Sequence, residues 1–160
     1  MNKGIILDEL DRKILQALQI DGRMTYDQLA EKVQLSPSAA LRRVRKLEES
    51  GVIGAYVAFI EQDHVGLGLT AYVHVRIQRP GIAPGPDPME RFRVDVQNWP
   101  EVTQCASLTG EMDYLLRVVV GDMGDYSRFM LQKLLKHPSV HDCTTSFVMD
   151  WVKDTTALPL

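Results

Sequence analysis

The chain has 160 residues, of which 45% are hydrophobic and 24% are charged, and its net charge is −3. This apolar fraction is typical of a globular protein and excludes a disordered or fibrous chain, and no run reaches the roughly 20 apolar residues of a membrane span. Two cysteines are too few for a disulfide scaffold and the early residues are acidic, so we expect no secretory leader and a soluble, cytoplasmic protein that does not contact a membrane.

Two short amphipathic helices are predicted near the start of the chain. Apolar residues recur at helical spacing from Leu7 to Leu18, and the acidic first turn suits the helix dipole. We expect Gly22 to end this helix in a left-handed cap. Thr25 and Gln28 form a capping-box pattern, which predicts that a second helix begins there.

A third helix is predicted between Ser36 and Gly51. Ser36 followed by Pro37 is a typical N-cap and first-turn pair, and the glycine is a typical stop. The apolar run 52–60 then predicts a wing or hinge strand, and 61–68 is predicted to be a linker. The inner face of the third helix is expected to consist of Ala40, Leu41, Val44 and Leu47.

The second half of the chain predicts a ferredoxin-like sandwich. Residues 69–77 alternate between apolar and polar, as in a half-buried strand, and the proline-rich segment 78–88 predicts a loop. Further elements are expected as a helix at about 89–98, strands at 102–109 and 114–120, a helix at about 122–136 and a last strand at about 140–153. The order βαββαβ places two helices on one face of an antiparallel sheet, so the fold class is α+β.

The charge distribution separates the two halves. Residues 1–60 carry nine Lys and Arg against eight Asp and Glu, whereas the remaining residues carry nine against thirteen. We therefore predict a winged helix-turn-helix domain at 1–60, with the helix-turn-helix at about 26–45, and a sandwich domain at 69–160. Such asymmetry indicates a nucleic-acid-binding module joined to a different one.

The third predicted helix carries the candidate DNA contacts. If its apolar residues face the core, Ser38, Arg42 and Arg45 line the opposite side, where arginine can read guanine in the major groove. Arg43 and Lys46 flank that stripe and reach phosphates, and Ser36 adds a neutral donor at the helix N-terminus. Four cations per subunit predict a salt slope near −7 for a dimer. The alternative is a solvated face paired with neighbouring glutamates.

Four segments resemble the Lrp/AsnC (leucine-responsive or feast-famine) family of transcriptional regulators. LDELDRKILQALQIDGR and LAEKVQLSPSAALRRVRKLEESGVIGAYVA resemble the N-terminal half of the family, and TGEMDYLLRVVVGDM and SFVMDWVKDTTALPL its C-terminal half. The resemblance implies an amino-acid-sensing sandwich that forms dimers and then tetramers or octamers. It also implies binding of double-stranded DNA, often with bending or wrapping, and a response to a free amino acid held between dimers.

The resemblance also implies an effector site. Gly110, Asp113 and Tyr114 match the family's G-x-x-D-Y element, and the start of the last strand adds Thr144 and Ser146. Asp113 suits the ammonium group of an amino acid, and N–H groups near Gly110 with the two hydroxyls suit its carboxylate. From the residues alone, a plain turn is favoured, with Asp113 bonded to its own loop and Gly110 at positive φ.

Two departures from the family pattern are present. Ala39-Ala40 replaces the Pro-Cys or Thr-Pro pair that often follows LSP, and we expect this to alter base preference. The proline-rich loop 78–88 is longer than the usual connection, and we expect it to reshape the effector cleft or the dimer contact.

Neither an enzyme nor a metal site is predicted. His137, His141 and Cys143 suggest metal ligands, but Pro138 interrupts the helix on which the histidines would share a face. No nucleophile or phosphate-binding motif is present. We therefore expect a transcriptional regulator whose small-molecule effector is a free amino acid and which has no other cofactor. The alternative is an architectural protein that wraps DNA without a ligand.

Overall fold

The computed structural model describes residues 6–79 and 87–160, and the contacts divide the chain into two units. The helical unit contains the chain up to Phe59 together with Val152–Leu160, and the sandwich unit is Ile60–Trp151. No helix in the described part of the chain is both long and apolar enough to cross a bilayer.

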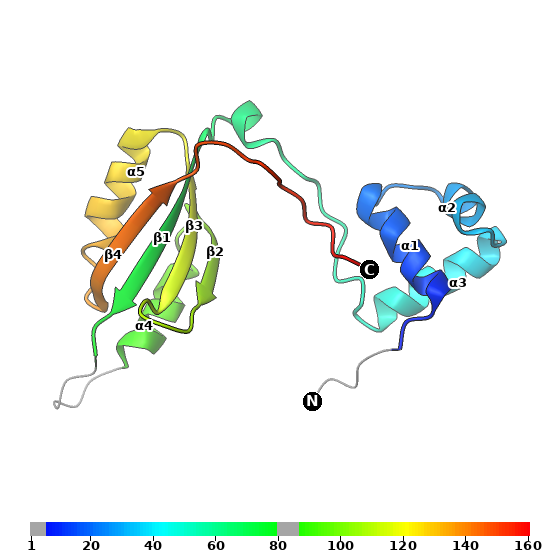
Figure 1. The fold of residues 1–160 in the computed structure, drawn as a ribbon, viewed down its shortest axis with the longest axis horizontal. Coiled ribbons are helices and arrows are strands. Elements are labelled where there is room, and N and C mark those ends of the chain that lie inside the picture. The colour runs from blue at the N-terminus through cyan, green and yellow to red at the C-terminus, as the bar shows by residue number, and fades with distance from the viewer. Residues whose placement is uncertain (1–5, 80–86) are drawn as a thin grey trace. The chain divides into compact units, whose positions relative to one another are not determined.

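The helical unit contains three helices, α1 (Glu9–Ile20), α2 (Tyr26–Val33) and α3 (Pro37–Glu49) (Figure 1). The predicted caps are present: Thr25 and Gln28 form a capping box, and the Ser36 hydroxyl accepts a hydrogen bond from the N–H of Ala39. The three helices share one apolar core, formed by Ile14, Leu15, Ala17, Leu29, Ala30, Val33, Ala40, Val44 and Leu47. Leu41, expected in this core, is half-buried.

The first helix ends differently from the prediction. Asp21, in an extended conformation, caps α1, and Gly22 does not adopt a positive φ. The reason for a glycine there is space, because a Cβ on Gly22 would lie 3.3 Å from Cδ1 of Tyr56.

The predicted strand at 52–60 is absent from the structure. Residues 54–60 are extended but have no strand partner in the described part of the chain. A strand requires a neighbour for its backbone groups, so an apolar run alone is insufficient. The wing is therefore not formed by these residues in a single chain.

Residues 152–160 were predicted to belong to the sandwich domain, but their contacts are with α1. The Gln19 side chain accepts a hydrogen bond from the N–H of Leu158 at 2.5 Å and donates to its carbonyl oxygen at 3.3 Å. Nε2 of Gln16 donates to the carbonyl oxygen of Leu160 at 2.6 Å. Hydrogen bonds between backbone groups and polar side chains leave no hydrophobic periodicity in the sequence, so the pattern of residues 152–160 did not predict them.

The sandwich unit has the predicted βαββαβ order. Its elements are the 3₁₀ turn η1 (Gln62–Val65), β1 (Leu69–Ile77), α4 (Pro88–Val96), β2 (Val102–Ser107), β3 (Tyr114–Val120), α5 (Met123–Phe129), the π-helical η2 (Met130–Leu134) and β4 (Val140–Phe147). All pairings in the sheet are antiparallel, and the strand order is β2-β3-β1-β4 (Figure 1). The last strand ends at Phe147, short of the predicted 153.

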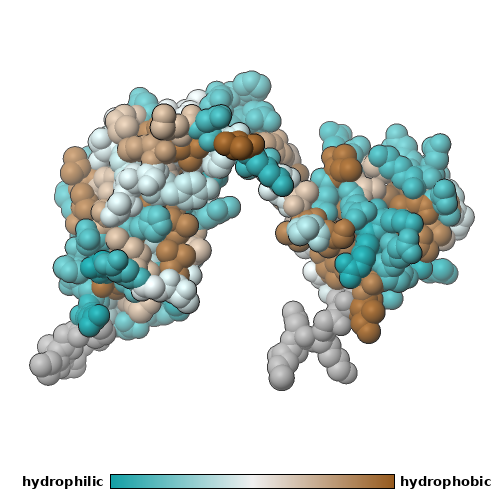
Figure 2. Space-filling model, in the orientation of Figure 1, coloured by the Kyte–Doolittle hydropathy of each residue, from teal (hydrophilic) through white to brown (hydrophobic). Residues whose placement is uncertain are grey.

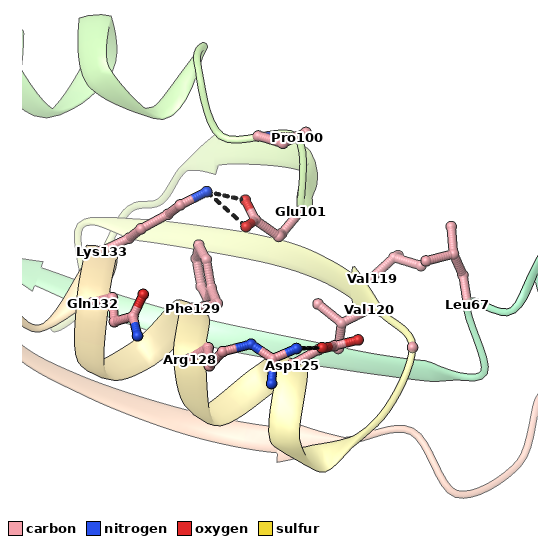
Figure 3. Close-up of a pocket in the computed structure, with 11 residues that line it drawn as sticks. Leu67, Pro100, Glu101, Val119, Val120, Asp125, Arg128, Phe129, Gln132 and Lys133 are labelled. Carbon is pink, nitrogen blue, oxygen red and sulfur yellow. Dashed lines mark hydrogen bonds and ion pairs between the residues drawn. The ribbon is translucent and has the colours of Figure 1, made fainter.

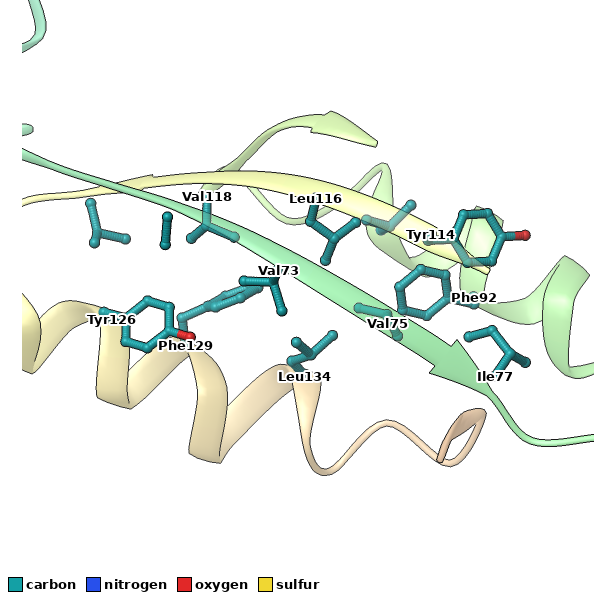
Figure 4. Close-up of a cluster of buried hydrophobic side chains, with 13 residues drawn as sticks. Val73, Val75, Ile77, Phe92, Tyr114, Leu116, Val118, Tyr126, Phe129 and Leu134 are labelled. Atoms are coloured by element: carbon teal, nitrogen blue, oxygen red, sulfur yellow. The ribbon is translucent and has the colours of Figure 1, made fainter. Parts of the chain in front are cut away.

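The core of the sandwich unit lies between the sheet and its helices. Figure 4 shows Tyr126, Phe129 and Leu134 facing the inner side chains of the central strands. In β1 every second residue from Ala71 to Ile77 is buried, as the alternation predicts. At the start of α5, Met123 is 52% exposed and lies outside this core.

Candidate functional site

The outer face of α3 presents a stripe of polar and basic side chains. Ser38, Arg42, Arg45 and Lys46 are exposed, whereas Ala40, Val44 and Leu47 are buried beneath them. Within the described residues, no ion pair involves Arg42, Arg45 or Lys46. In the view of Figure 2, hydrophilic side chains cover much of the helical unit, with hydrophobic side chains between them. The stripe is therefore free to meet a polyanion.

Arg43 differs from the prediction because it faces the unit itself. Its Nη1 lies 2.7 Å from Oδ2 of Asp8 and 2.7 Å from Oδ1 of Asp11. The N–H of Asp11 and then the Arg43 guanidinium lower the pKa of the Asp8 carboxyl below its usual value. Asp11 is 5% exposed, so this contact joins α3 to the buried start of α1. Because both carboxylates engage its guanidinium, we do not propose Arg43 as a DNA contact.

The N-terminus of α3 is held by a sharp turn. Gln34 adopts the left-handed conformation, with φ 57° and ψ 47°, and the N–H of Leu35 donates to the carbonyl oxygen of Ala30 at 2.9 Å. The Ser36 hydroxyl caps the helix and lies 3.2 Å from Oγ of Ser38. The two hydroxyls thus lie together at the helix end that favours an anion.

Tyr56 fixes the segment that follows α3 to the helices of the same unit. Its hydroxyl donates to Oε1 of Glu48 at 3.0 Å, and its ring lies against Gly22. Burial and then the neighbouring carboxylate raise the pKa of Tyr56 to about 12. The apolar run after α3, predicted as a strand, therefore supplies an aromatic anchor.

The β2–β3 hairpin carries two of the predicted effector residues. Gly110 has φ +119°, a conformation that side chains other than glycine rarely adopt. Asp113 is half-buried and forms two hydrogen bonds with the neighbouring strand. Its Oδ2 accepts the N–H of Ile77 at 2.7 Å, and its own N–H donates to the carbonyl oxygen of Val75 at 2.9 Å. The aspartate is thus held by β1 rather than by its own turn.

A cavity of about 840 Å³, which we call the hairpin cavity, lies beside this loop. Its size is within the range of small-molecule sites. Its lining is mainly charged and polar, with two apolar side chains, and consists of Arg76, Ile77, Gln78, Arg79, Asp87, Met89, Gly110, Glu111, Asp113 and His141. The structure therefore brings Gly110 and Asp113 together at one site and adds charged residues that the motif did not include.

Three of the predicted effector residues lie elsewhere. Tyr114 is buried in the core against Phe92, and its hydroxyl accepts a hydrogen bond from Nε of Arg93 at 2.9 Å. Thr144 and Ser146 are exposed on β4 and pair with β1 away from the cavity lining. The start of β4 instead contributes His141. Tyr114, Leu116 and Val118 are alternate residues of β3, so their shared apolar face in the sequence could have placed this tyrosine in the core.

The residues considered as metal ligands are not gathered into one site. Nε2 of His137 lies 3.0 Å from Oδ2 of Asp95, and its Nδ1 accepts the N–H of Ser139. His141 lines the hairpin cavity, and Cys143 packs against the sandwich core. Among the described residues, no three His, Cys, Asp or Glu side chains form a metal-ligand group.

A second cavity of about 520 Å³, the α5 cavity, lies between α5, η2 and the ends of β2 and β3 (Figure 3). Its charges are matched within the wall. Nζ of Lys133 lies 2.6 and 2.8 Å from the two carboxylate oxygens of Glu101, and Arg128 pairs with Asp125. Each cation in the described lining is thus already paired with a carboxylate, so these charges are less available to a ligand.

The chain matches two family models. The AsnC-type helix-turn-helix domain matches residues 7–48, and the Lrp/AsnC ligand-binding domain matches residues 70–158. The leucine-responsive regulatory protein of Escherichia coli is 38% identical over 155 residues, which cover 97% of this chain and 92% of that protein.

Solved structures with similar sequences have the same fold. The transcriptional regulator NMB0573 of Neisseria meningitidis, in its L-Met complex, is 45% identical, with a TM-score of 0.91 over 96% of this chain and 97% of the other. An AsnC family transcriptional regulator from Agrobacterium tumefaciens is 38% identical, with a TM-score of 0.86 over the same shares of the two chains.

Proposed function

The chain belongs to the Lrp/AsnC family of transcriptional regulators, and from that premise we propose that its binding to DNA, or its assembly, responds to a free amino acid. The family consists of regulators rather than enzymes. The single observation that carries the DNA-binding part is the stripe of exposed cations on α3, with the capped helix N-terminus beside it.

For DNA recognition, we assign the base-reading positions to Ser38, Arg42 and Arg45. They lie on one face of α3, opposite the buried residues, and an arginine in the major groove can grip guanine with both arms of its fork. Lys46 and the Ser36 hydroxyl are assigned to phosphates. Arg43 is excluded because Asp8 and Asp11 hold its guanidinium.

For the effector, we assign the hairpin cavity. An amino acid needs an anion near its ammonium group and donors near its carboxylate, and this cavity contains both kinds of side chain. The Neisseria relative was solved in an L-Met complex, which supports an amino acid as the class of ligand. Asp113 is the assigned partner of the ammonium group.

We also propose a homodimer, with dimers assembling into a tetramer or octamer. Among the described residues, the helices of the sandwich unit lie on one face of the sheet, and the other face, which includes Tyr72, His74 and Leu115, has no helix packed on it. Two recognition helices related by a two-fold axis read half-sites about one helical turn apart, or a multiple of it. Light scattering at several concentrations measures the assembly, and a monomer at all of them would contradict it.

The test is fluorescence anisotropy on duplex DNA from upstream of the protein's own gene, with and without the twenty amino acids. We expect binding that weakens steeply with salt and that the amino acids shift, after which single omissions name the effector. Binding that no amino acid changes would favour the architectural alternative, in which DNA is wrapped without a ligand. Absence of binding at low salt would overturn the DNA-binding assignment.

A further inference from the structure

One arginine in the hairpin cavity, Arg76, has a solvent-shielded N–H donor without a hydrogen-bond acceptor among the described residues. Nη2 of Arg76 donates to Oε1 of Glu111 at 2.9 Å. Its Nε is shielded from solvent, yet it has no hydrogen-bond partner in the described part of the chain. A shielded N–H without an acceptor is unfavourable, and such groups indicate a missing partner.

The Nε–H and one Nη2–H of Arg76 form a pair of donors that matches the two oxygens of a carboxylate. In a guanidinium, the Nε–H and the outer Nη2–H point in the same direction, so they bind the two oxygens of one carboxylate side by side. Glu111 contributes a single oxygen to this pair of donors. The other donor of the pair, the Nε–H, has no acceptor among the described residues.

Nearby carboxylates do not accept this N–H. Oδ2 of Asp113 accepts the N–H of Ile77, and Oδ1 of Asp87 accepts the N–H of Met89 at 3.0 Å. Both acidic groups are thus already engaged with the backbone. The partner that is present, Glu111, has an 86% exposed side chain in the loop after Gly110, and an ion pair with so exposed a carboxylate is weak.

We propose that Arg76 is the carboxylate-binding residue of the hairpin cavity, and that Glu111 occupies its guanidinium until the free carboxylate of a ligand displaces it. The proposal rests on the proposed function in that the ligand is an amino acid. It adds that the ligand must carry an ionised carboxylate rather than an amide or ester, and that the protein contains its own competitor for that group.

The variants separate these roles. Arg76→Gln removes the guanidinium, and we expect ligand binding to weaken by about 10- to 100-fold, as for the loss of a charge-assisted pair. Glu111→Gln removes the competitor and is expected to tighten binding several-fold. Arg128→Gln is the matched control, because it removes an ion-paired arginine at the α5 cavity, and we expect no change in affinity.

The experiment is titration calorimetry of the full chain with each of the twenty amino acids, beginning with L-Met, and with the carboxamide of whichever binds. Wild type should prefer the acid to the amide, and Arg76→Gln should bind both equally weakly. Circular dichroism checks that each variant is folded. Because Glu111 is exposed and lies outside β1, the Glu111→Gln result remains informative even if Arg76→Gln disturbs that strand.

The outcomes distinguish the two proposals. If wild type binds no amino acid, the proposed function fails and this inference fails with it. If wild type binds but Glu111→Gln does not tighten binding and Arg76→Gln retains full affinity, only this inference is overturned. A loss of affinity in Arg79→Gln with none in Arg76→Gln would also overturn it, because Arg79 is the other arginine in the described lining.

Discussion

Arg43 and Asp11 form an ion pair across the helical unit, with Nη1 of the arginine 2.7 Å from Oδ1 of the aspartate. The pair joins the recognition helix α3 to the first turn of α1, where Asp8 accepts a second bond from the same nitrogen. Of the four cations in five positions on α3, Arg43 is therefore engaged in ion pairs within the unit, and we propose the other three as DNA contacts. This division of roles leads to different predictions for adjacent arginines.

Replacing Arg43 with alanine should destabilise the helical unit. The change leaves the buried Asp11 carboxylate without its partner, which we expect to lower the free energy of unfolding by about 2 to 4 kcal/mol. Arg42→Ala is the matched control, since its side chain is exposed, and we expect a change within about 0.5 kcal/mol. Urea unfolding of the full chain, followed by circular dichroism, measures both. Equal losses from the two variants would refute the division of roles.

The charge of Asp8 should make this stabilisation depend on pH. The folded-state pKa of Asp8 lies below its usual value of 3.8, so the contribution is complete above that value and disappears as the pH falls through the lower, folded-state pKa. Asp8→Asn keeps an N-cap but removes the charge. We expect wild type to be the more stable at about pH 6, with the difference much reduced at about pH 3. A difference independent of pH would contradict the role of the ionised carboxylate.

Gly110→Ala should strain the hairpin through the backbone alone. Nothing lies within 4 Å of the added Cβ, but φ is +119°, so we expect a cost of about 1 to 2 kcal/mol. Gly54→Ala is the control, because it also has open space and lacks a positive φ. Unfolding midpoints of the two variants provide the comparison. If both changes have the same small effect, the loop relaxes and the conformation of Gly110 is not required.

Asp113→Asn separates the charge of this residue from its hydrogen bond. The amide oxygen can still accept the N–H of Ile77, so the fold should be retained, whereas attraction for an ammonium group is lost. We expect DNA binding to persist and amino-acid affinity to fall by about tenfold or more. Asp113→Ala should also reduce stability. A normal amino-acid response in Asp113→Asn would leave Asp113 as a structural residue of the hairpin.

Local signals in the sequence predicted the elements well. Thr25 with Gln28, and Ser36 with Pro37, mark helix starts because capping uses neighbours three residues apart. Strict alternation predicted β1, because one face of the sheet is buried. The family match and the strand order confirm the fold as a whole.

The side-chain placements that the sequence did not reveal depend mainly on contacts between segments far apart in the chain. The partner of Arg43 at Asp11 is 32 residues away, and helical periodicity does not reveal which flanking cation turns toward α1. Arg76 reaches Glu111 over 35 residues, through the pairing of β1 with β3. Tyr114 was assigned by its motif, although its alternation with Leu116 and Val118 places it in the core.

The most direct test of DNA recognition by α3 is the salt dependence of DNA binding in wild type and in the variant Arg42→Ala/Arg45→Ala. With three cations per subunit rather than four, a dimer neutralises about six phosphates and gives a salt slope of about −5. We expect the double variant to remain folded and to lose specific binding, with any residual slope near about −2. Unchanged affinity in a folded double variant would contradict the assignment of α3 as the DNA-reading helix.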